Sequence, residues 1–197
     1  MPKKSNAASP KAGKGSKRER TRARLIEAAI EVIREKGYDR TTLEEVARRA
    51  GMTRGAIYNN FKDKEDLFLA AAVTRWKPVA PPLKKGMSLK SIMRTLGEAA
   101  IEAVPERRAN ALAALSFQIY ALGNEAMRKR MVEVDAVCYR WAEERLLAAI
   151  PAKKLPMPPA QFVRVLHALT DGLLALRFLT PELISDDLII AAFESLA

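Results

Sequence analysis

Gly51 separates two short segments with helical apolar spacing, and this arrangement restricts the fold more than any other feature of the chain. In "TTLEEVARRA", just before the glycine, Leu43, Val46 and Ala47 recur at i, i+3 and i+4. The segment after it, "RGAIYNNF", is shorter and more polar, and Ile57 is its apolar anchor. A small residue at the crossing, a glycine in the turn and apolar residues between the helices are what a helix-turn-helix requires. We therefore predict a helix-turn-helix centred on Gly51.

The rest of the chain shows the same helical periodicity. Residues with capping side chains precede the first four predicted helices: Ser16, Thr42, Thr53 and Asp63. After a proline-rich break at 78–87, further helices are predicted at about 88–104, 106–122, 124–150 and 159–179, with a last one from Ser185. The sequence therefore predicts an all-α protein.

Positive charge is concentrated in the first third of the chain. Residues 1–64 hold 17 Lys+Arg against 8 Asp+Glu, whereas residues 65–197 hold 17 against 15. Clustered cations gain free energy by releasing the counterions of a polyanion, so nucleic acid or an anionic membrane surface is indicated. Ordinary solvated charge is the alternative. Residues 1–15 have almost nothing to bury and are expected to form a disordered basic tail.

The composition also indicates the cellular compartment in which the protein is expected. No apolar run reaches the roughly 18 residues that span a bilayer, and the N-terminus lacks the apolar segment of a secretory signal. Cys138 is the only cysteine, which excludes an intrachain disulfide and a thiolate metal cluster within one chain. We expect a cytoplasmic protein.

The segment after Gly51 presents many hydrogen-bonding side chains on its outward side. They are Thr53, Arg54, Tyr58 and Asn59, with Lys62 and Lys64 just beyond. An ordinary helical hairpin needs the same glycine and apolar positions but not this polar face. Such groups suit phosphates and base edges, so we interpret the segment as a DNA-reading helix.

Residues 17–70 resemble the DNA-binding domain of the tetracycline-repressor (TetR) family of bacterial transcriptional regulators. The resemblance rests on "LIEAAIEVIREKGYDRTTLEEVARRAGMTRGAIYNNFKDKEDLF", with its "AA", "G" then "TT", "VARRAG", T-x-G-x-I-Y-x-x-F and K-x-K-x-x-L elements. It covers about a quarter of the chain and implies a DNA-binding regulator with an all-helical C-terminal domain that encloses a small-molecule cavity and dimerises through its final two helices.

The resemblance also implies roles for individual residues. Phosphate contacts are expected from Thr42, Tyr58 and Lys64. Residues expected to face the major groove and to carry sequence choice are Thr53, Arg54, Ala56 and Asn59. Lys62 is included in the DNA-binding set for its charge, and Asn60 departs from the His common in the family, which leaves its role open.

We expect three parts: the tail at 1–15, a helix-turn-helix domain at 16–63 and an all-helical effector-binding and dimerisation domain at 64–197. The segments "FVRVLHALTDGLLALRFL" and "DDLIIAAFESLA" have apolar cover wider than one stripe, and Gly172 permits close helix packing. A homodimer through helices near 159–179 and 185–197 is predicted. The alternative is that both helices only cover their own core.

The effector site is less defined by sequence. Apolar candidates for its lining are Trp76, Phe117, Tyr120, Met127, Met131, Tyr139, Trp141 and Phe162, although residues at helical spacing often form plain core. His167 and Asp171 lie at i, i+4 and can contact a ligand or form a structural hydrogen-bonded pair. The companions of a metal site or catalytic triad are missing, so no metal, cofactor or enzyme activity is expected.

These observations favour a ligand-responsive DNA-binding repressor that leaves a palindromic operator when a small apolar molecule binds. An activator, or a regulator without ligand, remains an alternative. A helical enzyme would not explain the basic helix-turn-helix. A membrane-surface protein would need a broad lipid-facing stripe, whereas the apolar residues of the first three helices are used in packing one another.

Overall fold

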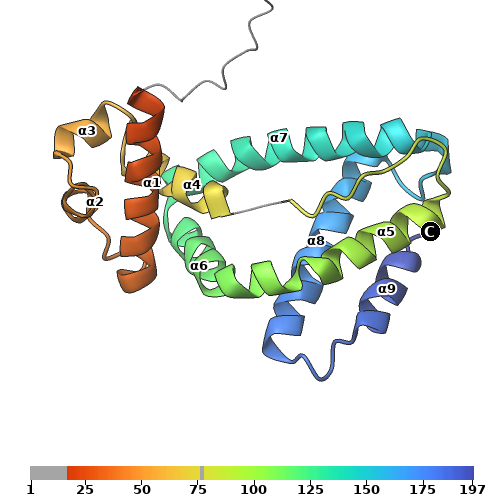
Figure 1. The fold of residues 1–197 in the computed structure, drawn as a ribbon. Coiled ribbons are helices and arrows are strands. Elements are labelled where there is room, and N and C mark those ends of the chain that lie inside the picture. Colours follow the sequence, from red (N-terminus) through yellow and green to blue (C-terminus); the bar gives the residue numbers. More distant parts are fainter. Residues whose placement is uncertain (1–16, 76–77) are drawn as a thin grey trace, which may run out of the picture.

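The computed structural model describes residues 17–75 and 78–197, and every regular element in these residues is helical (Figure 1). The elements are α1 (Lys17–Lys36), α2 (Leu43–Arg49), α3 (Arg54–Tyr58), α4 (Lys64–Arg75), α5 (Leu89–Glu102), α6 (Val104–Gly123), α7 (Glu125–Ala149), the 3-10 turn η1 (Ala152–Lys154), α8 (Pro159–Leu179) and α9 (Asp186–Glu194). The all-α prediction is confirmed. The predicted tail at 1–15, the cap Ser16 and the candidate Trp76 lie outside the described residues.

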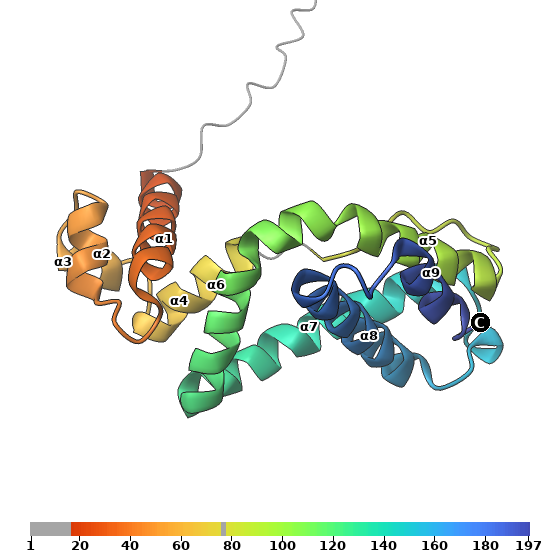
Figure 2. The ribbon, with the colours of Figure 1, turned by 90° about the horizontal axis from the view of Figure 1, so that it is seen from below.

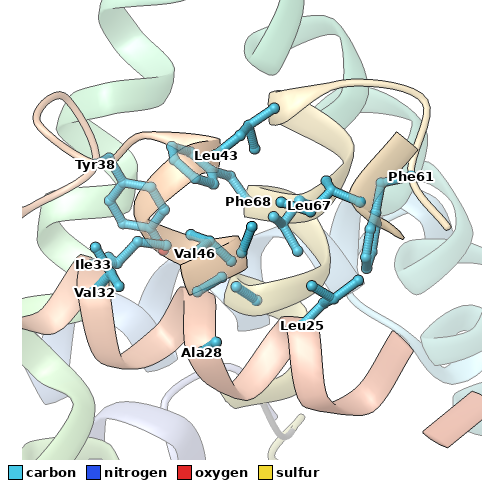
Figure 3. Close-up of a cluster of buried hydrophobic side chains, with 14 of the residues drawn as sticks. Leu25, Ala28, Val32, Ile33, Tyr38, Leu43, Val46, Phe61, Leu67 and Phe68 are labelled. Carbon is cyan, nitrogen blue, oxygen red and sulfur yellow. The ribbon is translucent and has the colours of Figure 1, made fainter. Parts of the chain in front are cut away.

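The helix-turn-helix unit is built around one apolar core. Figure 3 shows Leu25 of α1, Val46 of α2 and Phe68 of α4 converging on it, and all three side chains are fully buried. Ile57 anchors the short α3 in the same cluster. The turn depends on Gly51, whose φ of 62° lies in the left-handed region that other residues rarely adopt. The predicted corner is therefore present.

The capping side chains explain where the first elements begin. Thr42 precedes α2, and its hydroxyl accepts a hydrogen bond from the Glu45 backbone N–H at 3.3 Å. Asp63 precedes α4 and accepts one from the Asp66 N–H at 2.8 Å. Thr53 occupies the N-cap position of α3 but makes no capping hydrogen bond, so its hydroxyl is left for other partners.

The core of the helix-turn-helix unit continues into the corner between α6 and α7. Tyr38, in the turn that follows α1, packs against two aromatic residues of α6. Its ring centroid lies 5.3 Å from that of Phe117 and 5.5 Å from that of Tyr120. Met127 of α7 is fully buried in the same cluster. The Tyr120 hydroxyl donates to Glu65 Oε1 of α4 at 3.3 Å. The division after residue 63 stays a prediction, because α4 packs on α1 as well as on α6 and α7.

A second core joins α5, α7, α8 and α9. Figure 2 shows α5 and α9 running side by side, and their close approach depends on Gly97. A Cβ at Gly97 would lie 3.1 Å from Ile190 Cδ1 and 3.5 Å from Ile190 Cα. Phe162 of α8 and Ile189 of α9 are fully buried in this core. Within the described residues, no helix is long and apolar enough to cross a bilayer.

Candidate nucleic-acid interface and effector region

The predicted DNA-reading residues lie on the exposed side of α3 and at its borders. Thr53, Arg54 and Asn59 are exposed, Tyr58 is 49% exposed, and Ala56 is half-buried. Ile57 is fully buried beneath them, so the burial of one residue fixes which side of this short helix faces outward. The structure therefore brings these five candidates together on one surface.

Arg54 and Tyr58 contact each other in the free protein. Arg54 Nη2 donates to the Tyr58 hydroxyl at 3.0 Å, and the guanidinium carbon lies 5.6 Å from the Tyr58 ring centroid. Arg54 also forms an ion pair with Glu44 of α2. Both ion-pair partners are more than half exposed, so solvent screens the pair and it can be exchanged for a nucleic-acid contact.

The remaining DNA-binding candidates surround α3. Thr42 lies at the start of α2 with its hydroxyl engaged by Glu45, and Lys62 is exposed in the turn before α4. Lys64 begins α4, and its ammonium nitrogen lies 5.0 Å from the Phe68 ring centroid. This cation–π contact directs the Lys64 ammonium group toward the Phe68 ring, and the residue is half-buried.

A basic groove next to α3 was missed by the sequence analysis. Its volume is about 530 Å³, and it is lined by Lys17, Arg18 and Thr21 of α1 together with Asn59 and Asn60. The run "KRER" at the start of α1 was a usable signal, but only the fold shows that it meets the end of α3. Such a combination of cations and amides suits a backbone phosphate.

Asn60 follows α3 and hydrogen-bonds to the last turn of this helix. Its side-chain N–H donates to the Ala56 carbonyl at 2.8 Å, while Arg22 Nη1 donates to the Asn60 carbonyl at 3.1 Å. The Arg22 guanidinium carbon lies 4.2 Å from the Phe61 ring centroid. These contacts give Asn60 a structural role at the end of α3, and they connect α1 to α3.

The sequence-predicted effector residues fall into separate groups. Phe117, Tyr120, Met127 and Met131 belong to or pack on the core shared with the helix-turn-helix unit. Phe162 and Tyr139 belong to the second core or its edge. Trp141 is 41% exposed on α7, beneath the Arg145 guanidinium at 4.9 Å from the ring centroid. The structure does not gather these residues around one cavity.

His167 and Asp171 form part of a polar cluster between α6, α7 and α8. His167 Nδ1 lies 2.8 Å from the Tyr139 hydroxyl, and His167 Nε2 lies 3.1 Å from Asp171 Oδ2. Arg107 Nη1 of α6 lies 3.9 Å from Asp171 Oδ1. The hydrogen bond to Asp171 is the main cause of a raised pKa for His167, against the opposing effect of burial. No group of three or more potential metal ligands occurs among residues 17–75 and 78–197.

The outward side of α8 is an uninterrupted apolar stripe. It comprises Val165, Ala168, Gly172, Leu176 and Leu179, all of them exposed. On α9, Leu188 is 44% exposed, but Ile189 is fully buried in its own core. Ile189, within the segment predicted to form the dimer surface, is therefore directed toward α5 and α8 and cannot meet a partner.

The polar α3 on a glycine-cornered, basic three-helix unit defines a helix-turn-helix DNA-binding protein. Residues 25–71 match the family described as bacterial regulatory proteins, tetR family. A curated relative, the regulator SrpR of Pseudomonas putida, is 26% identical over 139 residues, which cover 71% of this chain and 65% of SrpR. Residues 25–71 are therefore similar to the N-terminal part of tetR-family regulators, and a longer stretch of the chain is similar to SrpR.

Solved structures of similar proteins share the whole architecture. NalD of Pseudomonas aeruginosa, the secondary repressor of the MexAB-OprM multidrug efflux pump, is 26% identical; the alignment covers 90% of this chain and 94% of NalD, with a TM-score of 0.56. Salmonella enterica GusR is 19% identical, with 92% of this chain and 97% of GusR covered and a TM-score of 0.70. The GusR similarity concerns the fold alone.

Proposed function

We propose that this protein is a ligand-responsive transcriptional repressor that binds a palindromic operator as a homodimer in the cytoplasm. The observation that carries the proposal is the exposed polar side of α3 on a basic helix-turn-helix unit. The SrpR and NalD similarities support regulation of transcription, and the role of NalD as a repressor of a multidrug efflux pump supports a response to small apolar molecules.

The division of labour on the DNA follows from the position of each side chain. Arg54, in the first turn of α3, is placed to donate two hydrogen bonds to a guanine edge, with Thr53, Ala56 and Asn59 beside it in the major groove. Tyr58, Thr42, Lys62 and Lys64 surround this patch and are assigned to phosphates. In this arrangement the residues in the major groove would determine which DNA sequence is bound, and the phosphate contacts would contribute affinity for any duplex.

The homodimer is assigned to the apolar stripe of α8, with Leu188 of α9 at its edge. A helix-interior glycine costs stability, typically 0.5–1 kcal/mol relative to alanine. No contact within the protomer requires a glycine at position 172, because no atom would lie within 4 Å of a Cβ there. A second α8 crossing at Gly172 would supply the reason and would cover Leu176, which is 50% exposed.

Release from DNA would use the contacts between α4 and the α6–α7 corner. Asp63, at the start of α4, pairs with Arg130 of α7, while Glu65 is bonded by Tyr120 and by Asn124, the latter at 3.4 Å. The two recognition helices of a dimer must lie about 34–36 Å apart, or a multiple of this spacing, to enter the major groove on one side of the duplex. A ligand that prefers a different position of this corner would change that spacing and weaken operator binding.

Operator selection from random duplex DNA, followed by a screen of apolar compounds for release, tests the proposal. We expect one palindromic consensus whose binding requires α3 residues, and at least one compound that lowers its affinity. Recovery of no consensus sequence, with uniform binding to all duplexes, would contradict sequence-specific repression.

A further inference from the structure

A groove lies between α6 and α7, close to the corner where the two helices meet. Of its lining residues, Met131 alone is among the effector-site candidates predicted from the sequence. Its volume is about 390 Å³, within the range of small-molecule sites. Ala121 and Leu122 form its α6 wall, and Met131 and Val132 form its α7 wall. Leu122 is 83% exposed and Val132 is 58% exposed, so the groove offers apolar surface that the chain itself does not cover.

Asp135 gives the groove an unbalanced negative charge. Its side chain is half-buried at the edge of the groove and forms no hydrogen bond or ion pair with any described residue. The positive group that acts most strongly on the Asp135 carboxylate is His167 of α8. His167 is already hydrogen-bonded to Asp171. Burial is the main cause of the raised pKa of Asp135, with a smaller contribution from Asp171. A half-buried carboxylate of this kind gains most from a cationic partner.

The cation in the same groove does not offset this charge. Arg128 is held by Glu125 through two hydrogen bonds, from Nε to Oε2 at 2.7 Å and from Nη2 to Oε1 at 2.8 Å. Both side chains are more than half exposed, so solvent screens this pair, and Lys129 Nζ lies 3.9 Å from the same carboxylate. Arg128 thus has a carboxylate partner of its own, whereas Asp135 has no hydrogen-bond or ion-pair partner among the described residues.

We propose that the α6–α7 groove binds an apolar organic cation, whose charged group pairs with Asp135 and whose body lies against Leu122, Met131 and Val132. The assignment rests on the proposed function, because it names the chemical class of the effector. It also connects the site to DNA binding: Ala121 lines the groove and is buried in the core of the helix-turn-helix unit, and Met131 packs on that core. A bound cation would thus touch the corner that holds α4.

Two probes of equal shape and opposite charge test the assignment. Tetraphenylphosphonium and tetraphenylborate are titrated calorimetrically into the wild type, Asp135→Asn and the control Asp187→Asn, which removes an exposed carboxylate from α9. We expect the wild type and the control to bind the phosphonium equally, and Asp135→Asn to bind it at least tenfold more weakly. Because the chain carries a net charge of +11, its overall field favours the borate, so a preference for the phosphonium must arise locally.

A second variant covers the case in which Asp135→Asn does not fold. Val132→Trp fills the groove from an exposed position and is expected to abolish phosphonium binding while the thermal midpoint stays near that of the wild type. Tighter binding of the borate, no phosphonium binding by the wild type, or equal phosphonium affinity in wild type and variants would overturn the assignment.

Operator binding without a probe separates this assignment from the proposed function. If the wild type binds a selected operator and another apolar compound releases it, while the phosphonium does not bind, the cation site is wrong and the repressor stands. If no operator is bound, the repressor is wrong, whatever the calorimetry shows for the groove.

Discussion

Arg54 and Tyr58 lie four residues apart on α3, and their 3.0 Å hydrogen bond couples the two roles that we assign to them. In the free protein the hydroxyl of Tyr58 accepts from Arg54, which also pairs with Glu44. DNA binding would replace the contacts of both side chains. The effect of a substitution at either position therefore has to be measured on operator and on unrelated duplex.

Arg54→Ala is expected to cost roughly 1–3 kcal/mol of operator affinity and to relax choice at one base pair per half-site, because it removes a bidentate donor to a guanine. Tyr58→Phe should weaken operator and scrambled duplex about equally, by roughly 0.5–3 kcal/mol, because it removes a phosphate donor. Titrations of both duplexes at one fixed salt concentration check this. A loss confined to operator for Tyr58→Phe would reverse the two assignments.

His167 carries a prediction about pH. Its pKa is raised in the folded protein, mainly by the hydrogen bond to Asp171, so its stabilising effect is complete below the unfolded-state value of about 6.5 and is lost as pH rises through the folded value. Other groups around it are Asp135 and Tyr139 of α7 and Arg107 of α6. The thermal midpoint of the wild type should fall relative to His167→Gln as the pH rises above about 6.5. A constant difference over this range would exclude the linkage.

At the scale of elements, α8 combines a buried side and an exposed side that are both apolar. Phe162 and Leu174 are buried, whereas Leu176 is half exposed and Leu179 is 75% exposed. A helix with apolar residues on both sides has a second surface to cover. Gly172, with open space around it, lies in the middle of that exposed surface.

Gly172→Ala distinguishes a covered α8 from a solvent-exposed one. In a monomer the substitution should stabilise the helix by roughly 0.5–1 kcal/mol, because alanine is the better helix former and no neighbour would clash with its Cβ. In the proposed dimer the added methyl group should separate the two helices and raise the dimer dissociation constant. Sedimentation equilibrium measures this constant, and Gln161→Ala, an exposed position earlier on α8, is the control. Unchanged association together with a higher thermal midpoint would place α8 in solvent.

At the scale of the whole molecule, charge is distributed so that the DNA-binding end is cationic and the rest is nearly balanced. The fold strengthens this asymmetry, because the basic start of α1 and the end of α3 form one groove. The helix-turn-helix unit and the C-terminal helices also share a core through Phe117 and Met127. A rearrangement of the α6–α7 corner would therefore be transmitted to the helix-turn-helix unit through this shared core.

Removing Lys17 and Arg18 together should lower the salt dependence of DNA affinity. If each side chain contacts one phosphate, the slope of log affinity against log salt should become shallower by about 0.9 per contact, or about 1.8 for the pair. The double variant Lys153→Ala, Lys154→Ala removes the same charge from the distant turn η1 and should leave the slope unchanged. Equal changes in both double variants would assign the effect to net charge alone.

The helices, the glycine corner and the polar character of α3 could be predicted from the sequence, because they depend on interactions within a few residues. Thr42 and Asp63 cap their helices as predicted, and the helix predicted at 159–179 has those bounds in the structure. The contacts between distant surfaces could not be predicted and are seen only in the folded chain. It placed Lys17 beside Asn59, buried Ile189 against α5 and α8, and set Asp135 at a groove between α6 and α7. Helical periodicity fixes the sides of a helix, but the partner of each side depends on packing between residues far apart in the chain.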